Sequence, residues 1–228
     1  MPEPTVSALI PVQNGERHLG EAIESILDQT RPVEEIIVVD NASTDRSAEI
    51  ARGFGGIVRV VEEPDPGVGL ARNAGLAAAA GDHLAFLDHD DLWEPRKTEL
   101  QVAALEGDPG LDFVVGHAIQ FTEDLDARVE ERVQMPSGSQ PAQHLDAVMA
   151  PRRTWERIGP WSRDVQMGEG LLWFLRAKDL GMRSLMLSDV IVRRRIHGEN
   201  RSFGNHHQRN EWTRALKASL DAKRAAGS

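Results

Sequence analysis

Four short apolar runs in the first hundred residues are separated by segments with helical spacing. The runs span residues 6–10, 35–39, 58–61 and 83–87. The second run is β-branched and does not alternate with polar residues, as expected for a parallel strand covered on both faces. Strands joined by helices in this way favour a parallel α/β sheet with right-handed crossovers.

Polar residues follow three of these runs. Asn14 comes shortly after the first, Asp40 ends the second, and Asp88-His89-Asp90-Asp91 follows the fourth. In parallel α/β sheets the carboxyl ends of the strands meet at one edge, where ligands bind. Clustered carboxylates repel one another unless a cation neutralises them, and their oxygens suit Mg²⁺ or Mn²⁺. An acidic loop that only caps the next helix is the alternative.

The composition limits the classes of function. The 228 residues carry a net charge of −10, with 40% hydrophobic residues, 27% charged residues and no cysteine. These values are typical of a globular domain, argue against non-specific nucleic-acid binding, and exclude disulfides and zinc–thiolate sites. No signal peptide or membrane-spanning apolar stretch is visible in the sequence. We therefore expect a cytoplasmic protein, with peripheral attachment to the inner face of the membrane left open.

The second half is less regular. Residues 113–121 predict one or two strands, and residues 183–187 and 190–195 predict two more. Residues 169–180 have helical spacing that stops at Gly181. Residues 208–225 predict a C-terminal helix whose apolar stripe packs on its own domain or on a second subunit, so a homodimer is left open.

Several short motifs occur in a fixed order along the chain. They are Pro11 with Asn14, then 25–30, 35–45, 69–75, 81–82 and 86–93, and finally Arg195-Ile196-His197-Gly198-Glu199-Asn200-Arg201-Ser202. Together they resemble the family 2 glycosyltransferases, which have the GT-A fold. The resemblance implies an α/β protein with a Rossmann-like mixed sheet and a single domain over 1–228. Residues 1–117 would bind a nucleotide sugar, and residues 118–228 would hold the acceptor.

The resemblance also implies roles for individual residues. Nucleotide-sugar binding would involve Pro11, Val12, Asn14, Glu16, Asp40, Arg72, Asp88 and Arg195. Asp40 would contact the base and Asp88 the ribose, whereas Asp90 and His197 would hold Mn²⁺ or Mg²⁺. A carboxylate can accept a hydrogen bond from a base N–H, and a guanidinium can contact a base or a phosphate. Turn, capping or purely structural roles remain open for Asn14, Asp40 and His197.

Two clusters in the second half have more than one interpretation. The run Arg193-Arg194-Arg195 could help to hold a pyrophosphate, although alternation along a strand would point Arg194 away from its neighbours. Trp155 and Trp161 could stack on an acceptor sugar, but a place in the core is the more frequent outcome for tryptophan.

The residue that usually supplies the general base is missing. Inverting members of the family use the Asp of a Glu-Asp pair at the start of a helix, and this chain has Glu169-Gly170. We favour Glu169 itself as the base. Another residue such as Asp164, or an acceptor that needs little activation, is an alternative. The Glu169 carboxylate is also of the type favoured in the first turn of any helix.

We therefore expect a metal-dependent, inverting glycosyltransferase that takes a sugar from a nucleoside-diphosphate donor, with UDP-sugars favoured. The acceptor would be a saccharide, a lipid-linked molecule or a peptide. The main alternative, motivated by Gly170, is a nucleotide-sugar-binding protein that does not catalyse transfer. A nucleotidyltransferase is disfavoured because residues 11–15 contain one glycine, and only Arg17 nearby is basic.

Overall fold

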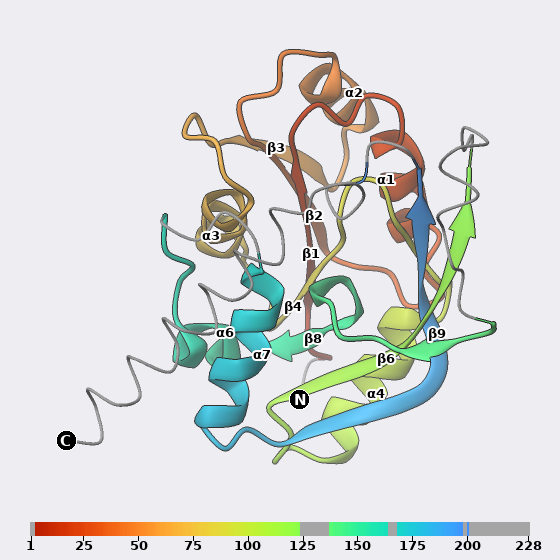
Figure 1. Ribbon diagram of the computed structural model, residues 1–228, viewed down its shortest axis with the longest axis vertical. Coiled ribbons are helices and arrows are strands. Elements are labelled where there is room, and N and C mark those ends of the chain that lie inside the picture. The colour runs from red at the N-terminus through yellow and green to blue at the C-terminus, as the bar shows by residue number, and fades with distance from the viewer. Residues whose placement is uncertain (1–2, 124–136, 164–167, 198–199, 201–228) are drawn as a thin grey trace.

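A mixed sheet, with nine strands in the part of the chain that the structure describes, forms the centre of the protein (Figure 1). The computed structural model describes residues 3–123, 137–163, 168–197 and 200. The strands are β1 (Val6–Val12), β2 (Glu35–Asp40), β3 (Val58–Glu62), β4 (His83–Phe86), β5 (Leu92–Trp93), β6 (Phe113–Thr122), β7 (Gln140–Pro141), β8 (Met149–Pro151) and β9 (Ser184–Ile196). Their order is β3-β2-β1-β4-β8-β6-β9-β5, with β7 beside β6.

Helices cover the sheet on its two sides. They are α1 (Leu19–Leu27), α2 (Ser47–Phe54), α3 (Val68–Ala78), α4 (Lys97–Gly107), α6 (Arg152–Ile158) and α7 (Glu169–Asp179), with a 3₁₀ turn, η1 (Leu145–Ala147). Figure 1 shows α1 and α3 on opposite sides of the β1–β4 strands. α1 buries Leu19, Ala22, Ile23 and Ile26, which recur at the spacing of one helix face.

The four strands predicted from the first hundred residues form one parallel block. β1 pairs with β2 and β4, and β2 pairs with β3, all in parallel. β1 is buried along its whole length, which explains its continuous apolar sequence. The strand order reverses between β1 and β4, so their carboxyl ends border the crevice where such sheets bind ligands.

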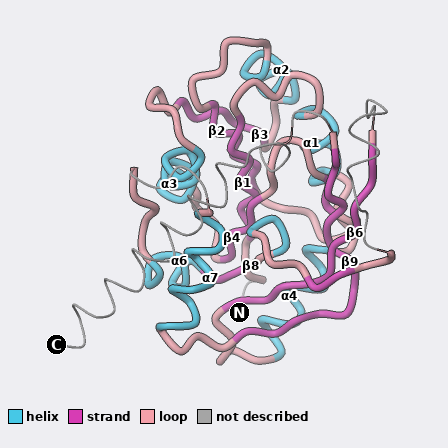
Figure 2. The backbone as a smooth tube through the Cα atoms, viewed as in Figure 1, coloured by secondary structure: helices cyan, strands magenta, loops and turns pink. Residues whose placement is uncertain are grey.

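The second half extends this sheet with mixed pairing. β8 pairs antiparallel with β4, and β6 pairs antiparallel with β8 and parallel with β9. Residues 183–187 and 190–195 belong to one 13-residue strand, β9, and not to two strands as the sequence predicted. The register between β6 and β9 shifts between Val115 and His117 of β6. This irregularity accommodates the residues between the two predicted strands within one continuous strand. Figure 2 shows β6 and β9 running side by side.

The pattern of residues 43–52 predicts a helix with Thr44 and Asp45 in its first turn. In the structure helical residues begin only at Ser47, so the loop between β2 and α2 is longer than this pattern predicts. Asp45 accepts hydrogen bonds from the backbone and the hydroxyl of Ser47, and its other oxygen accepts one from the backbone of Glu16. These contacts tie the loop to the segment after β1 and leave it outside the helix.

One hydrophobic core includes residues of both halves, from Val6 to Val192. Trp155 and Trp161 are 3% and 6% exposed, so both indoles lie in the core and do not offer a sugar-stacking face. The predicted C-terminal helix at 208–225 lies outside the described residues. Within the described ranges, no helix is both long and apolar enough to cross a membrane.

Candidate functional site

A cavity of about 510 Å³ opens at the carboxyl ends of β1 and β4. Its wall combines the end of β1 and the following turn, the start of α3, the Asp88–Asp91 loop, the first residues of α7, and residues at the end of β9. Pro11, Val12, Asn14, Arg72, Asp88, Asp90, Glu169 and His197, all predicted site residues, line it. Ligand pockets of small molecules are commonly of this size and sit at this point of an α/β sheet.

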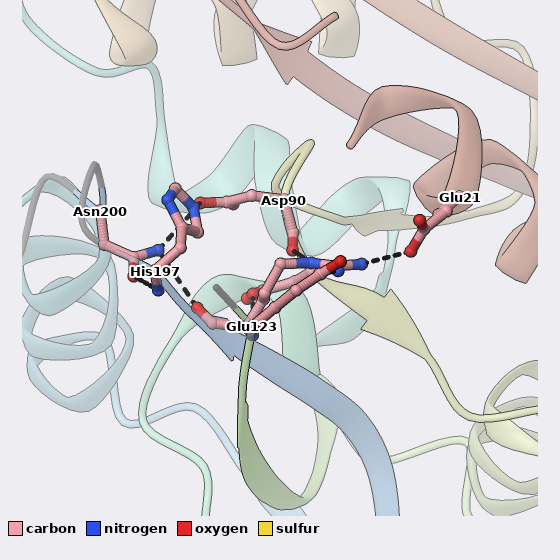
Figure 3. A network of polar contacts seen from close by, with 7 residues as sticks. Glu21, Asp90, Glu123, His197 and Asn200 are labelled. Atoms are coloured by element: carbon pink, nitrogen blue, oxygen red, sulfur yellow. Dashed lines mark hydrogen bonds and ion pairs between the residues drawn. The ribbon is translucent and has the colours of Figure 1, made fainter. Parts of the chain in front are cut away.

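Asp90 and His197, the two predicted metal ligands, meet in this cavity although they lie on different elements. His197 Nε2 is 3.1 Å from Asp90 Oδ2. The Asn200 side chain donates to the same oxygen at 3.1 Å, and its own Oδ1 accepts a hydrogen bond from the backbone N–H of His197. Figure 3 shows the three side chains converging on one point. The end of β9 therefore orients Asp90 through two contacts.

This pair fits a divalent cation that shares its shell with a ligand. Neighbouring ligands of an octahedral ion with bonds of about 2.1 Å lie about 3 Å apart, close to the separation of the Asp90 and His197 atoms. Within the described ranges, no group of three His, Asp or Glu residues is arranged to hold an ion without outside ligands. Mg²⁺ sites typically combine one or two carboxylates with substrate phosphates and water, so two protein ligands are sufficient.

Arg72 connects the two sides of the cavity. Its guanidinium donates to Asp88 Oδ1 and to Glu169 Oε1, both at 3.0 Å, and the residue is 4% exposed. The guanidinium also lies over the rings of Phe86 and Trp161, at 5.8 and 5.9 Å from their centroids. A buried cation with two carboxylate partners is fixed in place. Arg72 therefore fixes the position of the segment after β4 relative to the start of α7.

Buried carboxylates crowd the floor of the site and shift one another's pKa. Burial and the neighbouring charge of Asp146 raise the pKa of Asp88 to about 7. The same two causes, in the same order, raise the pKa of Asp91 well above its usual value. Burial opposes ionisation of Asp90 as well, but the hydrogen bond with His197 and nearby imidazole charges lower its pKa to about 2. Asp90 is therefore the carboxylate best suited to stay ionised and bind a cation.

Arg195 does not line the cavity. Its guanidinium is ion-paired with Glu21 and Glu123, and its Nε donates to the backbone carbonyl of Asp90 at 2.9 Å. Its backbone N–H donates to Asp91 Oδ1 at 2.8 Å. Arg194 points to the other side of β9 and lines the cavity, as strand alternation predicts. Of the two, Arg194 is the residue placed to meet a ligand.

Three other predicted donor-binding residues make contacts within the loops. Asp40 accepts a hydrogen bond from the backbone of Ser43, and Glu16 accepts one from the backbone of Arg46; neither residue lines the cavity. Asn14 lines it, adopts a positive φ of 55°, and holds the backbone of Thr44 through its side chain. The turn role left open for Asn14 is present. Asp40 does not cap a helix, because its hydrogen bond with Ser43 lies in the loop before α2, which begins at Ser47.

The position after Glu169 is spacious. A Cβ atom built on Gly170 would meet only Leu145 Cγ, at 3.7 Å, and the backbone there does not have the positive φ that requires glycine. Glycine at this position is therefore not required by packing.

Two residues of the site have no signal in the sequence. His18 lines the cavity, and its ring lies 5.0 Å from that of His197. Burial, followed by the charges of Arg195 and His197, lowers the pKa of His18 to about 4. Asp146 accepts a hydrogen bond from the backbone N–H of Asp88 at 3.1 Å and so orients the segment that follows β4. Asp146 lies in the short 3₁₀ turn η1, far from Asp88 in sequence, and only the folded chain brings the two residues together.

Curated relatives of the chain are glycosyltransferases. An uncharacterized glycosyltransferase of Rickettsia typhi is 28% identical over 208 residues, covering 85% of this chain and 64% of the relative. Glycosyltransferase AglE of Haloferax volcanii is 29% identical over 202 residues, covering 82% of this chain and 66% of the relative. The chain thus spans about two thirds of the length of these two relatives.

Solved structures share the fold. TarS 1-349 of S. aureus in complex with UDP-GlcNAc superposes with a TM-score of 0.68 at 19% identity, covering 88% of this chain and 61% of that TarS 1-349 chain. Glucosyl-3-phosphoglycerate synthase of Mycobacterium tuberculosis in complex with Mn²⁺, UDP and phosphoglyceric acid superposes with a TM-score of 0.62 at 24% identity, covering 95% and 77%. These matches confirm the predicted GT-A fold.

The family model described as glycosyl transferase family 2 matches residues 7–157. That range contains the parallel block, the Asp88–Asp91 loop and Arg72, the parts of the chain that form most of the cavity. The resemblance seen in the sequence motifs is confirmed, and the chain belongs to glycosyltransferase family 2.

Proposed function

We propose that the protein transfers a sugar from a UDP-sugar to an acceptor hydroxyl, with inversion, and uses Mn²⁺ or Mg²⁺. The observation that carries this proposal is the Asp90–His197 pair inside a cavity of about 510 Å³ at the switch point of the sheet. Two proteins of the same fold, TarS and glucosyl-3-phosphoglycerate synthase, are described in complex with UDP-GlcNAc and with UDP and Mn²⁺.

The donor would lie along the edge of the sheet. Residues at the end of β1, including Pro11 and Val12, would border the nucleoside, and Asp88 would accept a hydrogen bond from a ribose hydroxyl. Asp40 stands at the end of β2, and its carboxylate accepts a hydrogen bond only from Ser43 among the described residues, so it keeps acceptor capacity for a base N–H. Arg194, on the cavity wall, would contact the diphosphate.

Asp90 and His197 would bind the metal ion through Oδ2 and Nε2. A bound Mn²⁺ or Mg²⁺ would act as a Lewis acid toward the diphosphate oxygens and neutralise charge on the leaving group. Asn200 keeps the Asp90 carboxylate turned toward this position. His197 must present an unprotonated Nε2 to bind a metal, so metal binding would compete with its hydrogen bond to Asp90.

In the transfer step, the acceptor oxygen would attack the anomeric carbon while the bond from that carbon to the diphosphate oxygen breaks. The acceptor proton would pass to a general base, and the electron pair of the broken bond would leave with UDP. Glu169 lines the cavity at the start of α7 and is our candidate for the base. Its Oε1 is held by Arg72 at 3.0 Å, which leaves Oε2 to receive the proton.

The role of Glu169 can be tested by UDP release from UDP-glucose and UDP-N-acetylglucosamine in the presence of Mn²⁺. Glu169→Gln keeps a hydrogen-bond acceptor for Arg72 but removes the base. We expect turnover to fall by about 10²-fold or more, as for loss of a general base, with UDP affinity unchanged. Undiminished turnover by folded Glu169→Gln would contradict the assignment.

Gly170→Asp is the complementary variant. The position has room for the side chain, and a carboxylate in the first turn of α7 is favoured by the helix dipole. If Glu169 is a weak substitute for the usual aspartate, Gly170→Asp raises turnover above that of the wild type. Gly170→Ala is the matched control because it changes the backbone freedom without adding a carboxylate.

The second candidate function is nucleotide-sugar binding without transfer. The observation that favours it is the ion pair of Glu169 with Arg72, which occupies one of the two oxygens of this carboxylate. This function predicts UDP-sugar binding without UDP release by the wild type, and release that begins only in Gly170→Asp.

A further inference from the structure

An unpartnered ring nitrogen lies in the wall of the donor cavity. His18 directly precedes α1, is 5% exposed, and lines the cavity. Its Nε2 is buried and has no hydrogen-bond partner among the residues that the structure describes. Burying a polar atom without a partner is destabilising, so native proteins rarely retain one unless a ligand, ion or water completes it.

The neighbours of His18 do not supply the missing contact. The ring packs against that of His197 at a centroid distance of 5.0 Å and an angle of 41°. The nearby carboxylate of Asp90 already takes hydrogen bonds on Oδ2 from His197 and Asn200. His18 therefore stands beside the predicted metal ligands without joining their network.

The surroundings of His18 favour an oxyanion over a cation. Arg17 and Arg194 line the same cavity. The N-terminal end of α1, which begins at the next residue, adds partial positive charge there. Among the described residues, His18 does not complete a three-residue group that could hold a metal ion. The carboxylates of the cavity come from the Asp88–Asp91 loop and Glu169. Beside Arg17 and the N-terminal end of α1, a phosphate oxygen is a ligand atom that suits an imidazole N–H.

We propose that His18 is a donor-binding residue whose Nε2–H hydrogen-bonds to an oxygen of the donor diphosphate. The inference rests on the proposed function, because it needs a diphosphate in the cavity. It adds a contact on the α1 side, opposite Arg194 on β9, so that two elements far apart in sequence would hold the diphosphate between them.

The test is calorimetric titration of UDP and of uridine, each with Mn²⁺, into wild type and His18→Phe. Phenylalanine keeps an aromatic ring against His197 and removes both ring nitrogens. We expect UDP affinity to fall by about tenfold or more, the usual effect of losing a hydrogen bond to a charged group, and uridine affinity to stay the same. His83→Phe is the matched control, because His83 Nδ1 is also buried without a partner but lies outside the cavity.

Each other outcome overturns the inference. Unchanged UDP affinity in His18→Phe would show that His18 does not contact the diphosphate. An equal loss of affinity for UDP and uridine would show that His18 maintains the shape of the cavity and does not bind the diphosphate. If His18→Phe does not fold, His18→Gln and His18→Met provide a pair of similar size with and without an N–H donor, and only the Gln variant should retain UDP affinity. Failure of the wild type to bind UDP would overturn the proposed function and this inference with it.

Discussion

Arg194 and Arg195 are neighbours in sequence but lie on opposite sides of β9. Arg195 is 2% exposed and ion-paired with Glu21 of α1 and Glu123 after β6, and it also holds the carbonyl of Asp90. Arg194 lines the cavity. Arg195 therefore positions the Asp88–Asp91 loop from the side away from the cavity, and Arg194 forms part of the cavity wall. Residue type alone does not distinguish these roles, but the alternation of side chains along the strand does.

This division predicts different effects for the same substitution at the two sites. Arg195→Met should lower the free energy of unfolding by about 2–3 kcal/mol, because it removes a buried, multiply hydrogen-bonded cation while its half-exposed glutamate partners regain water. Arg194→Met should unfold near the wild-type temperature but bind UDP about tenfold more weakly. Thermal unfolding and UDP titration of both variants provide the check. Destabilisation by Arg194→Met with no effect of Arg195→Met would contradict the assignment.

Individual site residues differ in how far the sequence could predict them. Asp90 and His197 were predicted from motifs, and the fold does bring their side chains together. The side of the strand on which Arg195 lies could be predicted only as an alternation relative to Arg194. His18 and Asp146 could not be predicted, because the ring contact of one and the backbone contact of the other depend on distant elements.

At the scale of elements, Trp161 joins α3 to the start of α7. The side-chain amide of Asn73 donates to the Trp161 carbonyl at 2.9 Å, and its oxygen accepts from the Trp161 N–H at 3.0 Å. Trp161 Nε1 then donates to the Glu169 carbonyl at 3.1 Å. A Cβ on Gly69 would lie 2.9 Å from Trp161 Cβ, so glycine permits the close approach. This series of hydrogen bonds fixes the position of Glu169 relative to Arg72 of α3.

Trp161→Phe should therefore slow sugar transfer without weakening donor binding. The ring remains in the core, but the hydrogen bond to the Glu169 carbonyl is lost, and we expect kcat to fall about 5- to 10-fold. Trp155→Phe is a matched control in the same aromatic cluster, because Trp155 Nε1 has no hydrogen-bond partner in the described part of the chain. Equal kcat values for the two variants, measured by UDP release with UDP affinity as the reference, would refute the coupling.

At the scale of the whole molecule, the first half was more predictable than the second. The strands β1 to β4 are mostly apolar segments that alternate with helices, and right-handed crossovers leave few ways to arrange them. β8 has three residues and pairs with β4 across more than 60 positions of sequence, so no local pattern reveals it. β9 begins with exposed residues, which made one strand look like two. Pairing between residues far apart in the sequence determines where these strands form.

The site lies where the two halves meet. The first half contributes Asn14 and Asp88, from the segments after β1 and β4, and Arg72 of α3. The second half contributes Glu169 of α7, Arg194 of β9, and His197 just after β9. Metal and donor binding should therefore depend on both halves being folded together, since Asp90 from the first half is held by His197, Asn200 and Arg195 from the second.

The most direct test of this account is calorimetric titration of UDP with and without Mn²⁺, for wild type and Asp90→Asn. Asp189→Asn, an exposed position outside the cavity, controls for the substitution itself. We predict that UDP binds tightly only when Mn²⁺ is present, that Asp90→Asn abolishes the Mn²⁺ dependence while unfolding at a similar temperature, and that Asp189→Asn behaves as wild type. Absence of Mn²⁺-dependent UDP binding by the folded wild type, or its persistence in Asp90→Asn, would contradict the proposed metal-dependent donor site.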